Sequence, residues 1–230
     1  MKKRILQVSH LTKKYGKYTA VDGLNMTLFE GDIYGLTGKN GAGKSTLIHM
    51  IAGLARPTDG CIFLFGSRDL TPLRSNLGTV TMPPALYPNM TARENLTVQC
   101  KLLHITDTDD HIHTVLLMTG LMETGQKKVK NFSSGMKQRL AVAAALLNFP
   151  KLLILDEPTG ALDTEGIRDI RELILRLNQK YNITVLISSQ RPEELSGMAT
   201  RYGIMHNGKL LVECTEKDLW KSCWKERLLS

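Results

Sequence analysis

Short apolar runs rich in leucine and β-branched residues alternate along the chain with longer segments whose apolar residues recur at helical spacing. The short runs predict strands, and they are Ile5 to Val8, Ile33 to Thr37, Cys61 to Phe65, Leu152 to Asp156, Thr184 to Ser188 and Tyr202 to Met205. Two apolar helical faces are predicted from Leu47, Ile48, Ile51 and Leu54 and from Ile167, Ile170, Leu173, Ile174 and Leu177. Strands that alternate with helices indicate an α/β sheet core.

The stretch from about Pro84 to Leu147 carries helix signals with almost no strand between them. Thr91-Ala92-Arg93-Glu94 is a capping-box pattern that opens a helix. Three apolar helical sides are predicted, from Leu96, Cys100 and Leu103, from Ile112, Val115, Leu116 and Thr119, and from Met136, Leu140, Ala144 and Leu147. The simplest interpretation is a helical subdomain inserted into the α/β core.

Composition and charge exclude several classes of protein. The longest apolar stretch, Ala141 to Leu147, is far shorter than the roughly 18 residues of a membrane span, and the start of the chain is too polar for a signal peptide, so we expect a cytoplasmic protein. The four cysteines form no C-x-x-C pair and indicate neither zinc nor disulfides. The net charge of +8 suits a phosphate ligand, an anionic membrane surface or a nucleic acid, but the basic residues are scattered, which argues against nucleic acid.

The C-terminal segment offers one more apolar pattern, made of Leu219, Trp220, Cys223, Trp224 and Leu228. These residues would share one face of a helix. That face could pack on its own domain or contact a membrane or a partner.

A glycine-rich loop carries the strongest chemical signal. The loop matches G-x-x-x-x-G-K-[ST] between a predicted strand and a predicted helix, and its residues are Gly38, Lys39, Asn40, Gly41, Ala42, Gly43, Lys44 and Ser45, with Thr46 next. Glycines let successive backbone N–H groups point at a β-phosphate, and the helix N-terminus adds favourable charge. Lys44 would neutralise the β- and γ-phosphates, and Ser45 would ligate Mg²⁺.

A second signal is the apolar run from Leu152 that ends in two adjacent carboxylates, Asp156 and Glu157. On a strand these would point to opposite sides and could hold different roles. Asp156 suits the Mg²⁺ shell through water, and Glu157 suits orienting or deprotonating the attacking water.

Phe132-Ser133-Ser134-Gly135-Met136-Lys137-Gln138-Arg139 resembles the signature motif of the ABC ATPases, and the resemblance runs from about Ile5 to Val212. It implies a P-loop, RecA-like core with an antiparallel β subdomain. It also implies that residues 1–230 form one domain, with the core in 1–83 and 149–230 and the helical subdomain in 84–148.

In function, the resemblance implies an ATP-hydrolysing transporter subunit that dimerises around two ATP. Ser133 and the N–H of Gly135 would contact the γ-phosphate held by a second protomer, Tyr15 would stack on adenine, and Asp163 would lie in the loop that links the two sites. Read without the family, Ser133 and Asp163 are ordinary helix caps, and Tyr15 is a structural turn residue. Separately encoded permease subunits would hold the chain on the inner face of the cell membrane.

Two departures from the family pattern concern hydrolysis. Met82 stands where the family has Gln or Glu, and a thioether is a poor ligand for Mg²⁺. Gln190 replaces the switch histidine, so it can donate a neutral hydrogen bond to the γ-phosphate but cannot become charged. The first glycine of the signature is also replaced, by Ser134.

Three functions therefore remain open. The first is a transport ATPase, and the run from Pro84 to Leu96 together with the signature ending resembles the branch that exports, or gives immunity to, bacitracin and lantibiotic peptides. The second is a nucleotide-gated module with little intrinsic ATPase activity. The third, an ABC protein acting on DNA or ribosomes, is disfavoured because the chain has neither a coiled-coil insertion nor a second cassette.

Overall fold

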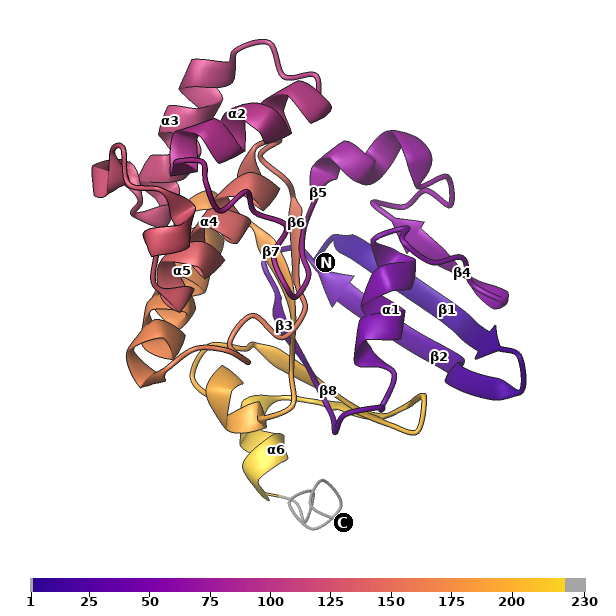
Figure 1. Cartoon of the computed structure of the whole chain (residues 1–230). Helices are drawn as coiled ribbons and strands as arrows, with labels where there is room; N and C mark the ends of the chain where they lie inside the picture. Colours follow the sequence, from indigo (N-terminus) through magenta and orange to yellow (C-terminus); the bar gives the residue numbers. More distant parts are fainter. Residues whose placement is uncertain (1, 222–230) are drawn as a thin grey trace.

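The computed structural model describes residues 2–221, which form two β-sheets and six α-helices with short 3₁₀ turns (Figure 1). The strands are β1 Arg4–Tyr15, β2 Tyr18–Phe29, β3 Ile33–Thr37, β4 Asp59–Leu64, β5 Leu77–Val80, β6 Leu152–Leu155, β7 Thr184–Ser189, β8 Arg201–His206 and β9 Lys209–Cys214. The α-helices are α1 Lys44–Ile51, α2 Ala92–Leu102, α3 Thr108–Thr119, α4 Ser134–Leu146, α5 Thr164–Tyr181 and α6 Glu216–Lys221. The 3₁₀ helices are η1 Thr71–Asn76, η2 Met122–Thr124, η3 Val129–Asn131 and η4 Pro192–Leu195.

The larger sheet has six strands in the order β5-β6-β7-β3-β8-β9, all parallel except β9. Every residue of β3, β6 and β7 is buried, because helices or the second sheet cover both faces. This burial explains why these strands read as continuous apolar runs. Because β6, β7 and β3 are adjacent and parallel, their carboxyl ends lie next to one another at the same end of the sheet.

The smaller sheet is antiparallel, in the order β2-β1-β4. A two-residue turn joins β1 to β2 and pairs Tyr15 with Tyr18. The predicted α/β core and antiparallel β part are thus both present. The apolar runs do not predict β2, β5 and β9. Polar residues such as Asp22, Asn25 and Glu213 interrupt the pattern of β2 and β9, and β5 has only four residues, with Gly78 and Thr79 between its two apolar ones.

Successive residues of the central strands divide between two apolar clusters. Leu153 and Leu155 pack with α2 to α5, whereas Leu152 and Ile154 pack with α1 and the three-stranded sheet. In Figure 1 the helices α2 to α5 accordingly lie on one side of the large sheet, and α1 with β1, β2 and β4 lies on the other.

The capping box that opens α2 is present as predicted. Thr91 Oγ1 accepts a hydrogen bond from the Glu94 N–H at 3.1 Å, and the Thr91 N–H donates to Glu94 Oε2 at 2.7 Å. The Thr91 N–H, and secondarily Lys128, hold the pKa of Glu94 below its ordinary value.

Two residues assigned to apolar helical faces are in the wrong place. Leu54 lies beyond the end of α1 and is exposed, and Leu103 follows α2 and is 42% exposed. Both helices end before the periodic pattern does, α1 in a turn that contains Gly53. Of the C-terminal residues, Leu219 is buried, the side chain of Trp220 is not described, and Cys223, Trp224 and Leu228 lie outside the described residues. Within residues 2–221, no helix is both long and apolar enough to cross a membrane.

Candidate functional site

The glycine-rich loop joins the end of β3 to the start of α1, as its motif requires. Gly38 and Gly43 have φ angles of 155° and 102°. A Cβ atom at Gly38 would lie 2.3 Å from the Met205 carbonyl oxygen, and one at Gly43 would lie 2.3 Å from that of Ala20. Both conformation and close approach therefore require glycine at these two positions.

Lys44 opens α1 and is 4% exposed. Its Nζ donates hydrogen bonds to the carbonyl oxygens of Gly38 at 2.7 Å and Lys39 at 3.2 Å, and lies 3.2 Å from Glu157 Oε1. The residue before it, Gly43, offers no side-chain cap, so the first N–H groups of α1 keep their capacity for an anion.

Asp156 and Glu157 lie just beyond β6, which ends at Leu155. The prediction that these two residues continue the strand, with side chains on opposite sides of it, is wrong, because β6 has already ended and Glu157 has a positive φ of 49°. Ser188 on β7 positions both residues instead. Its hydroxyl donates to Asp156 Oδ1 at 2.6 Å and accepts from the Glu157 N–H at 2.8 Å.

Gln190 follows β7 and donates from Nε2 to Glu157 Oε2 at 2.5 Å. One carboxylate oxygen of Glu157 thus faces the Lys44 ammonium, and the other faces a neutral amide. Lys44 and Gln190, which come from two other segments of the chain, therefore both contact the carboxylate of Glu157. Together the three residues offer a cation, a base and a neutral hydrogen-bond donor beside an anion-binding loop.

A shallow pocket of about 180 Å³ lies over this loop. It is lined by Asn40, Gly41, Ala42, Gly43, Lys44, Ser45, Thr46, Glu157, Ala20, Tyr15 and Tyr18. Tyr15 is 51% exposed at the rim, with Lys13 Nζ 4.8 Å from its ring centroid. Sequence reasoning selected Tyr15 but missed Tyr18, whose pairing with Tyr15 across the hairpin brings it to the same rim.

Ser133, Gly135 and Asp163 are not among the residues that line this pocket. Ser133 caps α4 and accepts from the Met136 N–H at 3.2 Å, and Asp163 caps α5 and accepts from the Gly166 N–H at 2.8 Å. The two helix starts adjoin, since a Cβ atom at Gly135 would lie 3.7 Å from the Gly166 Cα. Ser133 and Asp163 are both exposed.

Comparison with known proteins identifies this arrangement. The ABC transporter family profile matches residues 21–160. The chain belongs to the ABC transporter ATP-binding family. It is 45% identical over 212 residues to the bacitracin transport ATP-binding protein BcrA of Bacillus licheniformis, covering 91% of this chain and 69% of BcrA. It is 38% identical to the lantibiotic transport ATP-binding protein SrtF of Streptococcus pyogenes, covering 91% and 90%.

Solved structures of ABC transporter cassettes share the fold of this chain. CbiO1 of Clostridium perfringens, described as part of the ABC transporter complex cbiONQ, is 26% identical with a TM-score of 0.86, covering 98% of this chain and 94% of its own. The ATP-binding cassette MJ0796, solved as a dimer in a post-hydrolysis state with ADP and Pi, is 26% identical with a TM-score of 0.80, covering 92% and 98%. These likenesses confirm the predicted ABC ATPase fold and the prediction of an ATP-hydrolysing ABC transporter subunit.

Proposed function

We propose that this cassette binds ATP at the pocket over the glycine-rich loop and hydrolyses it with Glu157 as general base. The meeting of Lys44, Glu157 and Gln190 above the loop carries the proposal. On binding, the Lys44 ammonium exchanges the Gly38 and Lys39 carbonyl oxygens and Glu157 for β- and γ-phosphate oxygens. Loop N–H groups hold the β-phosphate, and Tyr15 stacks on adenine.

The donors beside the loop suit Mg²⁺. Ser45 supplies a hydroxyl and Asp156 a carboxylate, and Mg²⁺ prefers such hard oxygen ligands with phosphates and water completing its shell. Within residues 2–221, no group of three or more His, Cys, Asp or Glu side chains could hold a metal by itself. Ser45 and Asp156 would hold the ion together with the phosphates, and the ion would offset phosphate charge. Met82, 39% exposed at the end of the β5 segment, adds no oxygen ligand.

ATP also joins two copies of the chain. Ser133 and Asp163, at the starts of α4 and α5, are exposed to a partner and do not line the pocket of their own protomer, and Gly135 lies buried two residues after Ser133. Ser133 and the Gly135 N–H contact the γ-phosphate held by the second protomer, where the helix N-terminus attracts the anion. Asp163 links the two sites.

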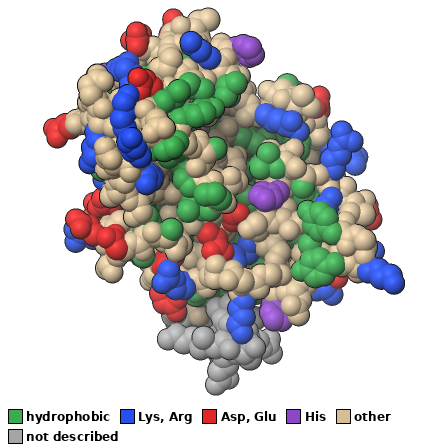
Figure 2. Space-filling model, in the orientation of Figure 1, with side chains coloured by type: hydrophobic (Ala, Val, Ile, Leu, Met, Phe, Trp, Pro, Cys, Tyr) green, Lys and Arg blue, Asp and Glu red, His purple; other side chains and the backbone are tan. Residues whose placement is uncertain are grey.

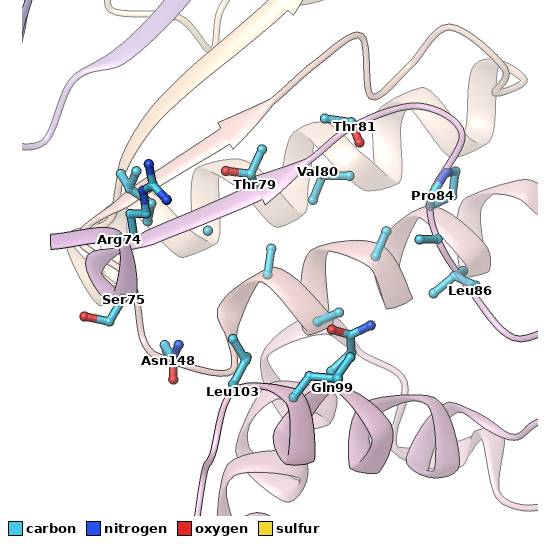
Figure 3. A pocket seen from close by; sticks show the side chains of 17 residues that line it. Arg74, Ser75, Thr79, Val80, Thr81, Pro84, Leu86, Gln99, Leu103 and Asn148 are labelled. Carbon is cyan, nitrogen blue, oxygen red and sulfur yellow. The ribbon is translucent and has the colours of Figure 1, made fainter. Parts of the chain in front are cut away.

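The membrane partner docks in a second, larger groove of about 550 Å³. Figure 3 shows Thr79 and Val80 of β5 on one side of it, with Gln99 and Leu103 of the α2 segment facing them. It has no lining residue in common with the pocket over the glycine-rich loop, so it is separate from the phosphate site. Figure 2 shows hydrophobic side chains gathered where the helical layer adjoins this strand. Leu102 and Leu103 line the groove and are exposed, and Met82, two residues after β5, is also exposed. An apolar segment of a permease subunit would cover them.

Leu103→Asp is expected to weaken binding of the permease about tenfold or more, equal to about 1.4 kcal/mol, because it places an unpaired charge in an apolar interface. Leu117→Asp is the matched control, since Leu117 on α3 is 61% exposed and does not line the groove. Co-purification of the permease with each variant measures the effect. Equal recovery with both variants would move the docking surface elsewhere.

In this arrangement residues 84–148 act as a helical subdomain on the rest of the chain, and the cassette sits on the cytoplasmic face of the membrane through separately encoded permease subunits. The cargo is an antimicrobial peptide of the bacitracin or lantibiotic type, by analogy with BcrA and SrtF. Cells that express the cassette with its permease should tolerate a higher peptide concentration than cells that express Glu157→Gln. Equal tolerance would contradict this cargo.

Hydrolysis is slow in this proposal, because Met82 and Gln190 replace two groups that the resembled family uses. Gln190→His is expected to raise turnover with nearly unchanged ATP affinity, since the gained interaction belongs to the transition state. Losing one such donor typically costs about 10²- to 10³-fold in rate, and the Gln190 amide retains part of it. Steady-state ATPase assays of Gln190→His, Met82→Gln and the double variant measure the gain, and non-additivity would show that the positions act together. If no variant hydrolyses ATP faster than wild type with the permease present, Met82 and Gln190 are not the cause of slow hydrolysis.

A further inference from the structure

Glu194 in η4 is an almost buried carboxylate to which the proposed mechanism gives no role. Its side chain is 9% exposed. Oε2 accepts hydrogen bonds from the Thr159 hydroxyl at 2.6 Å and the Ser189 hydroxyl at 3.0 Å. Arg191 Nη2 lies 2.6 Å from Oε1, but within the described residues that oxygen receives no well-aligned hydrogen bond.

The two donors flank the reacting groups. Thr159 comes two residues after Glu157, and Ser189 comes directly before Gln190. The side chains of Glu157 and Gln190 also contact each other directly. The segments around Glu157 and Gln190 are therefore joined twice, once by that contact and once by Glu194 through Thr159 and Ser189.

The η4 turn is anchored separately from these loops. Arg171 of α5 donates to the Glu194 carbonyl oxygen at 2.9 Å and also bonds the Ser196 carbonyl oxygen. Helix α5 begins directly after Asp163, at the far end of the loop that contains Thr159. The backbone of Glu194 is thus held by α5, while its side chain contacts Thr159 and Ser189.

Burying a carboxylate costs free energy, and packed apolar residues could join two loops without that cost. A carboxylate oxygen that accepts hydrogen bonds from two hydroxyls, one of them short, fixes distance and direction, which apolar contacts do not. We propose that Glu194 is a positioning residue for ATP hydrolysis: it sets the separation of the loops that carry Glu157 and Gln190. This inference rests on the roles proposed above for those two residues.

Glu194→Ala is expected to lower kcat for ATP about 10- to 100-fold while the ATP dissociation constant changes less than about twofold, because misplacement of reacting groups costs rate rather than binding. Glu194→Gln keeps an acceptor oxygen and should retain most of the rate. Thr159→Val and Ser189→Ala each remove one donor with little change in volume, and they serve if Glu194→Ala does not fold. In the Glu194→Gln background either change should lower kcat, whereas after Glu194→Ala neither should lower it further.

Glu193→Ala is the matched control, since Glu193 is the exposed neighbour in η4. ATPase rates and ATP affinities are measured on the full chain with its permease. Suppose that Glu157→Gln is inactive, so that the proposed catalytic role of Glu157 stands. An unchanged kcat in Glu194→Ala, or equal losses of kcat and ATP affinity, would then overturn the positioning role of Glu194 without affecting the proposed function. If Glu157→Gln hydrolyses ATP as wild type does, the proposed catalytic roles fail and this inference fails with them.

Discussion

Lys44→Ala should reduce the affinity for ATP by about 10²-fold or more. A charge-assisted hydrogen bond is worth about 1.5–3 kcal/mol, and Lys44 would form such contacts with both the β- and γ-phosphate. The lysine is 4% exposed and already held over the loop by two carbonyl oxygens, so little ordering cost offsets the gain. Calorimetric titration with ATP measures the loss.

Lys151→Ala is the control for net charge, because Lys151 is exposed just before β6. Thermal unfolding of both variants tests whether the fold survives, since Lys44→Ala also leaves the Gly38 carbonyl oxygen without its partner. ATP affinity equal to wild type in a folded Lys44→Ala protein would remove Lys44 from the site.

Glu157→Gln should lower the rate of ATP hydrolysis by about 10²- to 10⁴-fold, the usual contribution of a positioned general base. The amide keeps the shape of the side chain and can still contact Gln190, but it cannot take a proton from water. ATP should bind at least as tightly, because the change removes a negative charge that faces Lys44 at 3.2 Å. Phosphate release and ATP titration on the same preparation separate the two effects.

Glu165→Gln is the matched control, an exposed carboxylate in the first turn of α5. Hydrolysis by Glu157→Gln at the wild-type rate would assign the base to another group. A parallel loss of ATP binding would instead indicate that Glu157 organises the empty loop through Lys44.

The strand, loop and helix that form the proposed phosphate site are predictable because their signals are local in sequence. The loop from Gly38 to Ser45 carries its own conformational requirements, and the buried strand before Asp156 appears as an uninterrupted apolar run. The capping box at Thr91 is equally local. Local patterns also failed where tertiary packing decides, as at Leu54 and Leu103, which continue a helical pattern beyond the helix end.

The residues that position the site were not predictable in this way. Ser188 reaches Asp156 across 32 positions of sequence, and Glu194 reaches Thr159 across 35. A serine in an apolar run has many uses, and only the adjacency of β6 and β7 shows which one applies. The direction of Glu157 likewise depends on its positive φ, which a sequence pattern that reads as a strand does not reveal.

Two copies of this chain should close around ATP, with Ser133 of one facing the phosphate loop of the other. Sedimentation velocity of Glu157→Gln, with and without ATP and Mg²⁺, tests it most directly, because a cassette that cannot hydrolyse ATP should stay closed. We expect a monomer without nucleotide and a dimer that holds two ATP when nucleotide is present. Adding Lys44→Ala to this variant should abolish the dimer. A protein that binds ATP at saturation yet remains monomeric would contradict it.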